Sequence, residues 1–162
     1  MTTTVSTDFL PNRTLSSVSN FKDTHLLKSL SRSCKARNFN ESLYFLRHLV
    51  NKGHKPDVVL CTKLIHGLFA SKTIDKAVQV MHILENHGQP DLIAYNAVIT
   101  GFCKANRIDS AYQVLDRMKN KGFSPDIVTY NILIGSLCSR GMLHAALEFE
   151  NQLLKENCKP TV

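Results

Sequence analysis

The sequence predicts an all-α fold, an α-solenoid of about four stacked helix-turn-helix repeats. Pro56, Pro90, Pro125 and Pro160 recur at intervals of 34, 35 and 35 residues, and a fixed period in this range is typical of solenoids. Apolar residues between the prolines recur at helical spacing, and no segment alternates with the period of two that strands show. A single helical hairpin cannot bury both of its apolar faces, so neighbouring hairpins are expected to stack.

The first helix of each repeat is predicted to begin directly after a proline-containing turn. In the second to fourth copies its apolar face is formed by Leu64, Ile65 and Leu68, by Val98, Ile99 and Phe102, and by Leu133, Ile134 and Leu137. The first copy is less regular. Terminal repeats are usually atypical because they cover the end of the stack, so we expect this copy to be an N-terminal cap.

The second helix of each repeat is predicted after a short polar break. Its expected N-caps are short polar residues that can accept hydrogen bonds from first-turn amides, namely Asn40, Asp75 and Asp109. Its expected closing residues favour the left-handed conformation of a C-cap, namely Gly53, Gly88, Gly122 and, in the last copy, Asn157.

These elements divide the chain into repeats at residues 23–57, 58–91, 92–126 and 127–161. Residues 1–22 are expected to be a disordered tail or a transit-peptide-like segment, because the first 20 are rich in Ser and Thr, contain one acidic residue and lack a helical apolar pattern. In the last hairpin, Leu147, Phe149, Leu153 and Leu154 are expected to remain exposed. Such a surface indicates either a truncated product or self-association.

The composition narrows the classes of function. Lys and Arg number 20 against 13 Asp and Glu, a formal charge of +7, which favours a polyanionic partner such as nucleic acid or an anionic membrane surface. No apolar run reaches the ~18 residues of a spanning helix, and no polybasic block adjoins an apolar face, so no membrane role is expected. The five cysteines form no Cys-x-x-Cys, and neither a cofactor, a metal site nor an enzymatic activity is expected. Cys34, Cys103 and Cys138 align with Phe69, which predicts buried packing residues.

Two runs resemble pentatricopeptide repeats of the pure 35-residue type, the P class of plant organelles. They are Tyr-Asn-Ala-Val-Ile-Thr-Gly-Phe-Cys-Lys-Ala at 95–105 and Ile-Val-Thr-Tyr-Asn-Ile-Leu-Ile-Gly-Ser-Leu-Cys at 127–138, supported by Asp109-Ser110-Ala111 and the closing Gly-x-x-Pro-Asp. The peptide-binding tetratricopeptide relatives would show a Trp-led opening, and this chain contains no Trp. The resemblance covers residues 23–162. It implies a right-handed superhelix that binds single-stranded RNA, with one base read per repeat by two or three side chains.

The resemblance implies that the fifth and the last residue of each repeat read one base together. The pairs are Leu27 with Asp57, Thr62 with Asp91, Asn96 with Asp126, and Asn131 with Thr161. In the family, Thr with Asp favours guanine, Asn with Asp favours uracil over cytosine, and Asn with a smaller polar partner leans to a pyrimidine. The expected core is therefore 5′-G-U-pyrimidine-3′, and Leu27 is expected to read nothing because it cannot hydrogen-bond. We expect the reading residues to lie on an open face and to contribute little to packing.

The resemblance also implies that the second residues Val59, Ile93 and Val128 sandwich the bases, and that Lys35 and Lys104 contact phosphates. Each assignment has a purely structural alternative. The aspartates would be favoured before any helix by its dipole, the asparagines could hydrogen-bond locally, and the apolar residues could belong to the core. The lysines could simply be solvated.

The sequence therefore predicts a non-enzymatic protein that acts in organellar RNA processing, stability or translation by occupying a transcript. The low Arg content of the N-terminal segment favours the chloroplast, with the mitochondrion as the alternative. The competing hypothesis is a scaffold for protein–protein interaction or self-association through the exposed face of the last hairpin.

Overall fold

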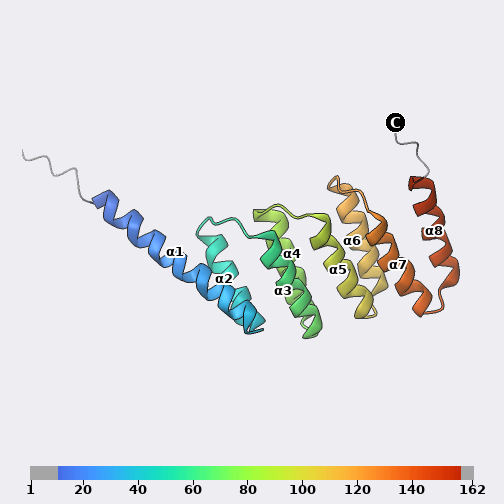
Figure 1. Ribbon diagram of the computed structural model, residues 1–162, viewed down its shortest axis with the longest axis horizontal. Coiled ribbons are helices and arrows are strands. Elements are labelled where there is room, and N and C mark those ends of the chain that lie inside the picture. The colour runs from blue at the N-terminus through green and yellow to red at the C-terminus, as the bar shows by residue number, and fades with distance from the viewer. Residues whose placement is uncertain (1–10, 158–162) are drawn as a thin grey trace, which may run out of the picture. The chain divides into compact units, whose positions relative to one another are not determined.

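The computed structural model describes residues 11–157, with side chains from residue 21 to 156 (Figure 1). Every regular element in this range is a helix, as predicted. The helices are α1 Pro11–Lys35, α2 Phe39–Asn51, α3 Val58–Ala70, α4 Ile74–His87, α5 Leu92–Lys104, α6 Ile108–Asn120, α7 Ile127–Ser139 and α8 Leu143–Asn157. The three predicted repeats from residue 58 onward therefore each contain one helical hairpin.

The helices form two units. The hairpin of α1 and α2 belongs to the first, which ends at His54, and α3 to α8 belong to the second, which begins at Lys55. In the second unit each second helix packs on its own first helix, and the first helices α3, α5 and α7 pack on one another in chain order (Figure 1). This arrangement confirms the α-solenoid prediction.

The predicted apolar faces form the core of the second unit. Leu64, Ile65 and Leu68 of α3 and Leu133 and Leu137 of α7 are buried. Tyr95 and Tyr130 are also fully buried. Their burial is tolerated because each hydroxyl donates a hydrogen bond to a carboxylate. Tyr95 donates to Glu85 at 2.9 Å and Tyr130 donates to Glu156 at 2.8 Å. Burial, reinforced by Glu156, raises the pKa of Tyr130 to about 12.

The N-caps of the second helices differ from the prediction. They are Asn38, Thr73 and Arg107, so the assignment of Asn40, Asp75 and Asp109 as caps is wrong by two residues. These three residues lie in the first turn instead. There the carboxylates of Asp75 and Asp109 are still stabilised by the positive end of the helix dipole.

The C-terminal glycines fall into two groups. Gly53 and Gly122 have φ of +88°, the left-handed conformation that was predicted. Gly88 is extended, with φ −125° and ψ −155°, so the prediction is wrong there. A glycine is needed at this position for a different reason, since a Cβ would lie 2.8 Å from Cγ of Pro56. Asn157 is the last residue of α8 rather than a residue beyond it.

The prediction of a disordered N-terminal tail is corrected for residues 11–22, and the transit-peptide-like alternative stays a prediction. Residues 11–22, expected to belong to a tail, are part of α1, which begins at Pro11. Proline is favoured at a first helical position because its φ is preset and its missing N–H would have no partner there. Within the first unit, Asp23 accepts hydrogen bonds from Lys52 Nζ and His54 Nε2, each at 2.9 Å, and so ties α1 to the end of α2. Residues 1–10 lie outside the described residues.

Among the described residues, no helix combines the length and the apolar character required to cross a bilayer.

Candidate nucleic-acid interface

The structure brings together one predicted reading pair, Asn96 and Asp126. Asn96 lies in α5, and Asp126 is the residue that precedes α7 in the next hairpin. Asn96 Nδ2 lies 3.5 Å from Asp126 Oδ1, and Asn96 Oδ1 accepts from Thr129 Oγ1 at 2.7 Å. Hydrogen bonds from the Thr129 amide, the Thr129 hydroxyl and the Asn96 amide hold the pKa of Asp126 below its usual value, against a smaller opposing effect of burial. This carboxylate therefore stays ionised and acts only as an acceptor at neutral pH.

The pair Thr62 and Asp91 is arranged differently. The Thr62 hydroxyl donates to the carbonyl of Val58 at 2.7 Å, and Asp91 accepts from the Ala94 amide at 2.8 Å. Thr62 thus directs its proton to its own helix and not to its predicted partner. Thr62 and Asn96 each expose only 8% of their surface, so the expectation that these residues contribute little to packing is wrong for both.

The two terminal pairs are only partly described. Leu27 is exposed and lies in the first unit, whereas Asp57 lies in the second. Asn131 is exposed on α7, and Thr161 lies outside the described residues.

All three predicted aspartates cap helices. Asp57 accepts from the Leu60 amide at 2.9 Å, Asp91 caps α5 in the same way, and Asp126 accepts from the Thr129 amide at 2.9 Å. Helix capping is thus by itself a sufficient structural reason for an aspartate at these positions. Asp126 additionally contacts Asn96, the fifth residue of its own repeat.

The second residues of the repeats are not core residues. Val59, Ile93 and Val128 expose 60%, 68% and 50% of their surfaces. Apolar side chains exposed at matching positions of successive helices are free to contact a ligand.

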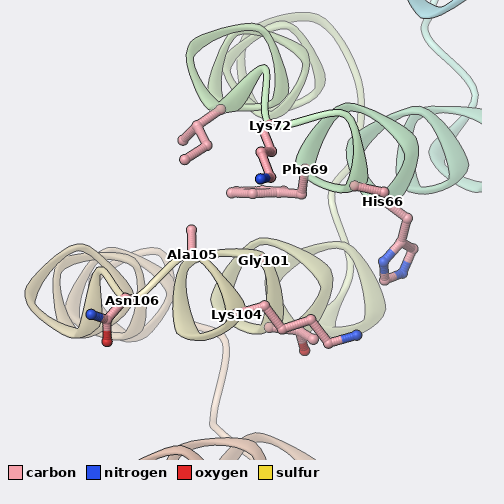
Figure 2. Close-up of a pocket in the computed structure, with 10 residues that line it drawn as sticks. His66, Phe69, Lys72, Gly101, Lys104, Ala105 and Asn106 are labelled. Atoms are coloured by element: carbon pink, nitrogen blue, oxygen red, sulfur yellow. The ribbon is translucent and has the colours of Figure 1, made fainter.

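The predicted phosphate contacts are exposed lysines. Lys35 and Lys104 lie in the last turns of α1 and α5, where a cation is also favoured by the helix dipole. Lys104 borders a cavity of about 460 Å³ between the C-terminal ends of α3 and α5, together with His66 and Lys72 (Figure 2). No acidic residue lines this cavity, so its electrostatic character is basic.

Successive hairpins differ at a residue that lines this cavity. Arg140, which follows α7, reaches α5 and donates from Nη2 to the carbonyl of Cys103 at 2.6 Å. Its counterpart one repeat earlier is Ala105, whose methyl group points toward the Phe69 ring (Figure 2). Alanine is too short to make the equivalent hydrogen bond to the preceding first helix.

Two further sequence predictions are corrected in this region. Of the aligned cysteines, Cys103 is buried, Cys34 is partly buried and Cys138 is exposed, because no further first helix packs on α7 within the described residues. In α8, Leu147 and Leu154 are each 55% exposed, as expected. Phe149, however, is partly covered and contacts the rings of Tyr112 and Tyr130, with centroids 5.5 and 6.2 Å away.

Thr129 and Lys72 lie at the candidate site but were not among the predicted site residues. The signal for Thr129 is its spacing from Asp126, since an N-cap residue and the residue three positions later form a reciprocal capping box. The signal for Lys72 is that it lies two residues after Ala70, which occupies the phosphate-contact position in its repeat. Lys72 itself has a left-handed backbone conformation (φ +59°).

Stacked helical hairpins of 34 to 35 residues, with polar and exposed apolar residues repeated on their first helices, define a helical-repeat protein. The chain belongs to the pentatricopeptide repeat family. It matches the PPR repeat family over residues 90–139 and 125–162, and the pentatricopeptide repeat domain over residues 44–100.

Similar proteins carry the same family name. The chain is 58% identical over 61 residues to the pentatricopeptide repeat-containing protein At3g04760, chloroplastic, of Arabidopsis thaliana; the match covers 38% of this chain and 10% of that protein. The pentatricopeptide repeat protein PPR10 from maize aligns with 84% of this chain and 25% of its own length, at 21% identity and a TM-score of 0.44. PPR10 in complex with an 18-nucleotide psaJ RNA element aligns with 86% and 26%, at 21% identity and a TM-score of 0.45. The chain therefore spans about a quarter or less of these proteins.

Proposed function

We propose that this chain binds single-stranded RNA and selects its sequence through paired side chains of successive repeats. The observation that carries the proposal is the contact of Asn96 with Asp126 across two neighbouring hairpins. A fifth residue and a last residue that are distant in sequence meet there, beside the exposed Ile93 and Val128. The expected core remains 5′-G-U-pyrimidine-3′, with Asn96 and Asp126 reading the uracil.

The chemistry of the interface suits an unpaired strand. Exposed apolar side chains of consecutive first helices offer surfaces on which a splayed base can pack, and short amide groups between them can bond to its Watson–Crick edge. Lys104 and Lys72 lie at one end of the same helices and can neutralise phosphates. The formal charge of +7 raises the attraction to any polyanion.

The proposed role is that of a P-class protein, which affects the processing, stability or translation of an organellar transcript by occupying it. The name of the Arabidopsis relative assigns that protein to the chloroplast, which supports a chloroplast location for this one over the mitochondrial alternative.

Fluorescence anisotropy with labelled oligonucleotides tests the proposal. The chain should bind a single-stranded RNA that contains G-U-C more tightly than the same sequence in a duplex, because the bases must be unstacked to be read. With about two to four phosphate contacts, log affinity should fall with log salt at a slope of roughly −1.5 to −3. Equal binding to duplex and single strand, or no dependence on salt, would refute the proposal.

A further inference from the structure

The cavity between the C-terminal ends of α3 and α5 is large enough to hold a small molecule. Its volume of about 460 Å³ falls within the range of known ligand sites. Its aromatic wall, the Phe69 ring, belongs to a residue seven positions after Thr62, which is roughly 10 Å further along α3. A hydrogen bond spans only about 3 Å. A ligand against this wall is therefore not the base that Thr62 is expected to read.

The inner wall of the cavity is apolar. Phe69 and Ile74 contribute to it from the first hairpin of the second unit, and Gly101 and Ala105 contribute from the next. The Phe69 ring lies directly on the backbone of Gly101, since a Cβ there would overlap the ring. The ring also makes an edge contact with Phe102, with centroids 5.3 Å apart. These contacts hold the ring in place, so the flat apolar body of a ligand can pack on a wall that already exists.

The rim of the cavity is cationic. Lys72 lies in the turn after α3 and Lys104 in the last turn of α5, on opposite sides of the cavity (Figure 2). Among the residues that the structure describes, neither lysine takes part in an ion pair, and no acidic residue lines the cavity. The Thr100 hydroxyl and the Asn106 amide also line it, and both can donate and accept hydrogen bonds. The cavity therefore offers two cations to an anion and short polar groups to the edge of a base.

The backbone fixes two of these rim residues. Lys72 and Asn106 occupy equivalent positions in the turns after α3 and α5, and both are left-handed, with φ of +59° and +63°. The Lys72 amide donates to the carbonyl of Phe69 at 3.0 Å, and the Asn106 amide donates to the carbonyl of Cys103 at 3.2 Å. Both turns are therefore formed without a ligand, so binding does not have to order them.

This combination of groups matches the chemistry of a nucleotide. Bases stack on aromatic side chains and bond to short polar groups through their edges, and phosphates pair with lysines. We propose that the cavity binds one nucleotide, with its base against Phe69 and Ile74 and its phosphate between Lys72 and Lys104. The nucleotide belongs either to the bound RNA strand, as a base additional to those read by the repeat pairs, or to the free nucleotide pool. Only the first source rests on the proposed function.

The following hairpin supplies the variant that tests the proposal. Arg140 occupies the place of Ala105 there and reaches the carbonyl of Cys103 on the preceding first helix. Ala105→Arg is therefore compatible with this kind of packing, and it should fill the cavity while it adds a positive charge. An added charge strengthens binding to any polyanion, so a loss of affinity reports the filled cavity. Ser71→Arg is the matched control, because it adds the same charge at the equivalent exposed position of the preceding hairpin, outside the cavity.

The test measures two ligands with the full chain. Anisotropy follows an RNA strand that contains G-U-C with adenosines on both sides, and protein-detected NMR follows adenosine 5′-monophosphate, with ribose 5-phosphate as the base-free control. In the wild type, the free nucleotide should shift the amide resonances of Gly101 and Ala105 more than ribose 5-phosphate does. Ala105→Arg should weaken binding of the cavity's nucleotide by roughly five- to hundredfold, the range of one base stacked on an aromatic ring. The uncharged Ala105→Leu should also weaken it, and Ser71→Arg should not.

The two arms distinguish the sources. If the nucleotide belongs to the strand, Ala105→Arg lowers RNA affinity, and an abasic site in place of one adenosine removes the difference between variant and wild type. If it is free, Ala105→Arg abolishes binding of the monophosphate without lowering RNA affinity. The inference is overturned if neither cavity-filling variant weakens either ligand in a chain that circular dichroism shows to be folded, or if ribose 5-phosphate binds as well as the nucleotide and RNA affinity does not fall. A wild type that binds the monophosphate at the cavity but no RNA would refute the proposed function and leave this inference standing, whereas a wild type that binds neither ligand would refute both.

Discussion

Gly101 in α5 provides a quantitative test of how the solenoid packs. A Cβ placed on Gly101 would overlap the ring of Phe69 in α3, whereas a Cβ on Gly135 in α7 would meet no atom within 4 Å. Both glycines lie inside helices, where alanine is intrinsically favoured by about 0.5–1 kcal/mol. The two substitutions thus share the backbone effect and differ only in the space available.

The expected magnitudes follow from that difference. Gly135→Ala should stabilise the chain by about 0.5–1 kcal/mol. Gly101→Ala should gain the same amount but incur an overpacking cost of about 1–3 kcal/mol, so the two variants should differ by that cost. Urea denaturation followed by circular dichroism measures both free energies of unfolding under one set of conditions.

The next pair of first helices suggests a substitution that should remove the overpacking cost of Gly101→Ala. Between α5 and α7, the residue equivalent to Phe69 is Cys103 and the residue equivalent to Gly101 is Ser136. The Cys103 thiol hydrogen-bonds with Ser136. The large Phe69 therefore packs over a glycine between α3 and α5, whereas the smaller Cys103 packs over a serine between α5 and α7. In a Phe69→Cys background the penalty of Gly101→Ala should disappear, a non-additivity that a double-mutant cycle detects. An equal penalty with and without the Phe69 ring would refute this account of the packing, and so would equal effects of the two alanine substitutions.

Three further predictions concern the interface and α8. Thr62→Asn should shift the base preference at its position from guanine toward uracil by about 1–2 kcal/mol, measured as the ratio of affinities for G-U-C and U-U-C strands. The substitution should also lower the free energy of unfolding, since Thr62 is buried. An unchanged base preference would contradict the reading assignment. Because the pKa of Asp126 is lowered in the folded chain, its stabilisation is present at neutral pH and is lost as the pH falls through that value. As the pH falls below the ordinary aspartate pKa of 3.8, the wild type should therefore lose stability more steeply than Asp126→Asn, which retains a capping group. Parallel acid titrations of the two proteins would exclude this role. If the exposed leucines of α8 support self-association, Leu147→Lys with Leu154→Lys should shift the mass measured by light scattering toward the monomer, with the partly covered Leu153 left in place; a wild type that is monomeric at high concentration would exclude the idea.

The local pattern of the sequence was enough to determine the repeats. Pro56, Pro90 and Pro125 mark where each hairpin restarts, because proline cannot continue a helix, and the helical spacing of apolar residues such as Leu64 and Leu68 identifies the face that packs. Both signals act within one or two helical turns, so they can be read directly. The same holds for Gly53 and Gly122, whose left-handed conformation suits glycine whatever surrounds it.

Other features depended on contacts between residues about 30 positions apart, and only the tertiary structure decided them. Gly88 was expected to be left-handed, but the approach of Pro56 requires a glycine there in an extended conformation. The sequence aligned Asn96 and Thr62 as equivalent reading residues, yet Asn96 accepts a hydrogen bond from Thr129 of the next hairpin, whereas Thr62 donates to its own helix. A periodic pattern specifies which face of a helix is buried, but which polar group meets which partner depends on how neighbouring hairpins are placed against each other.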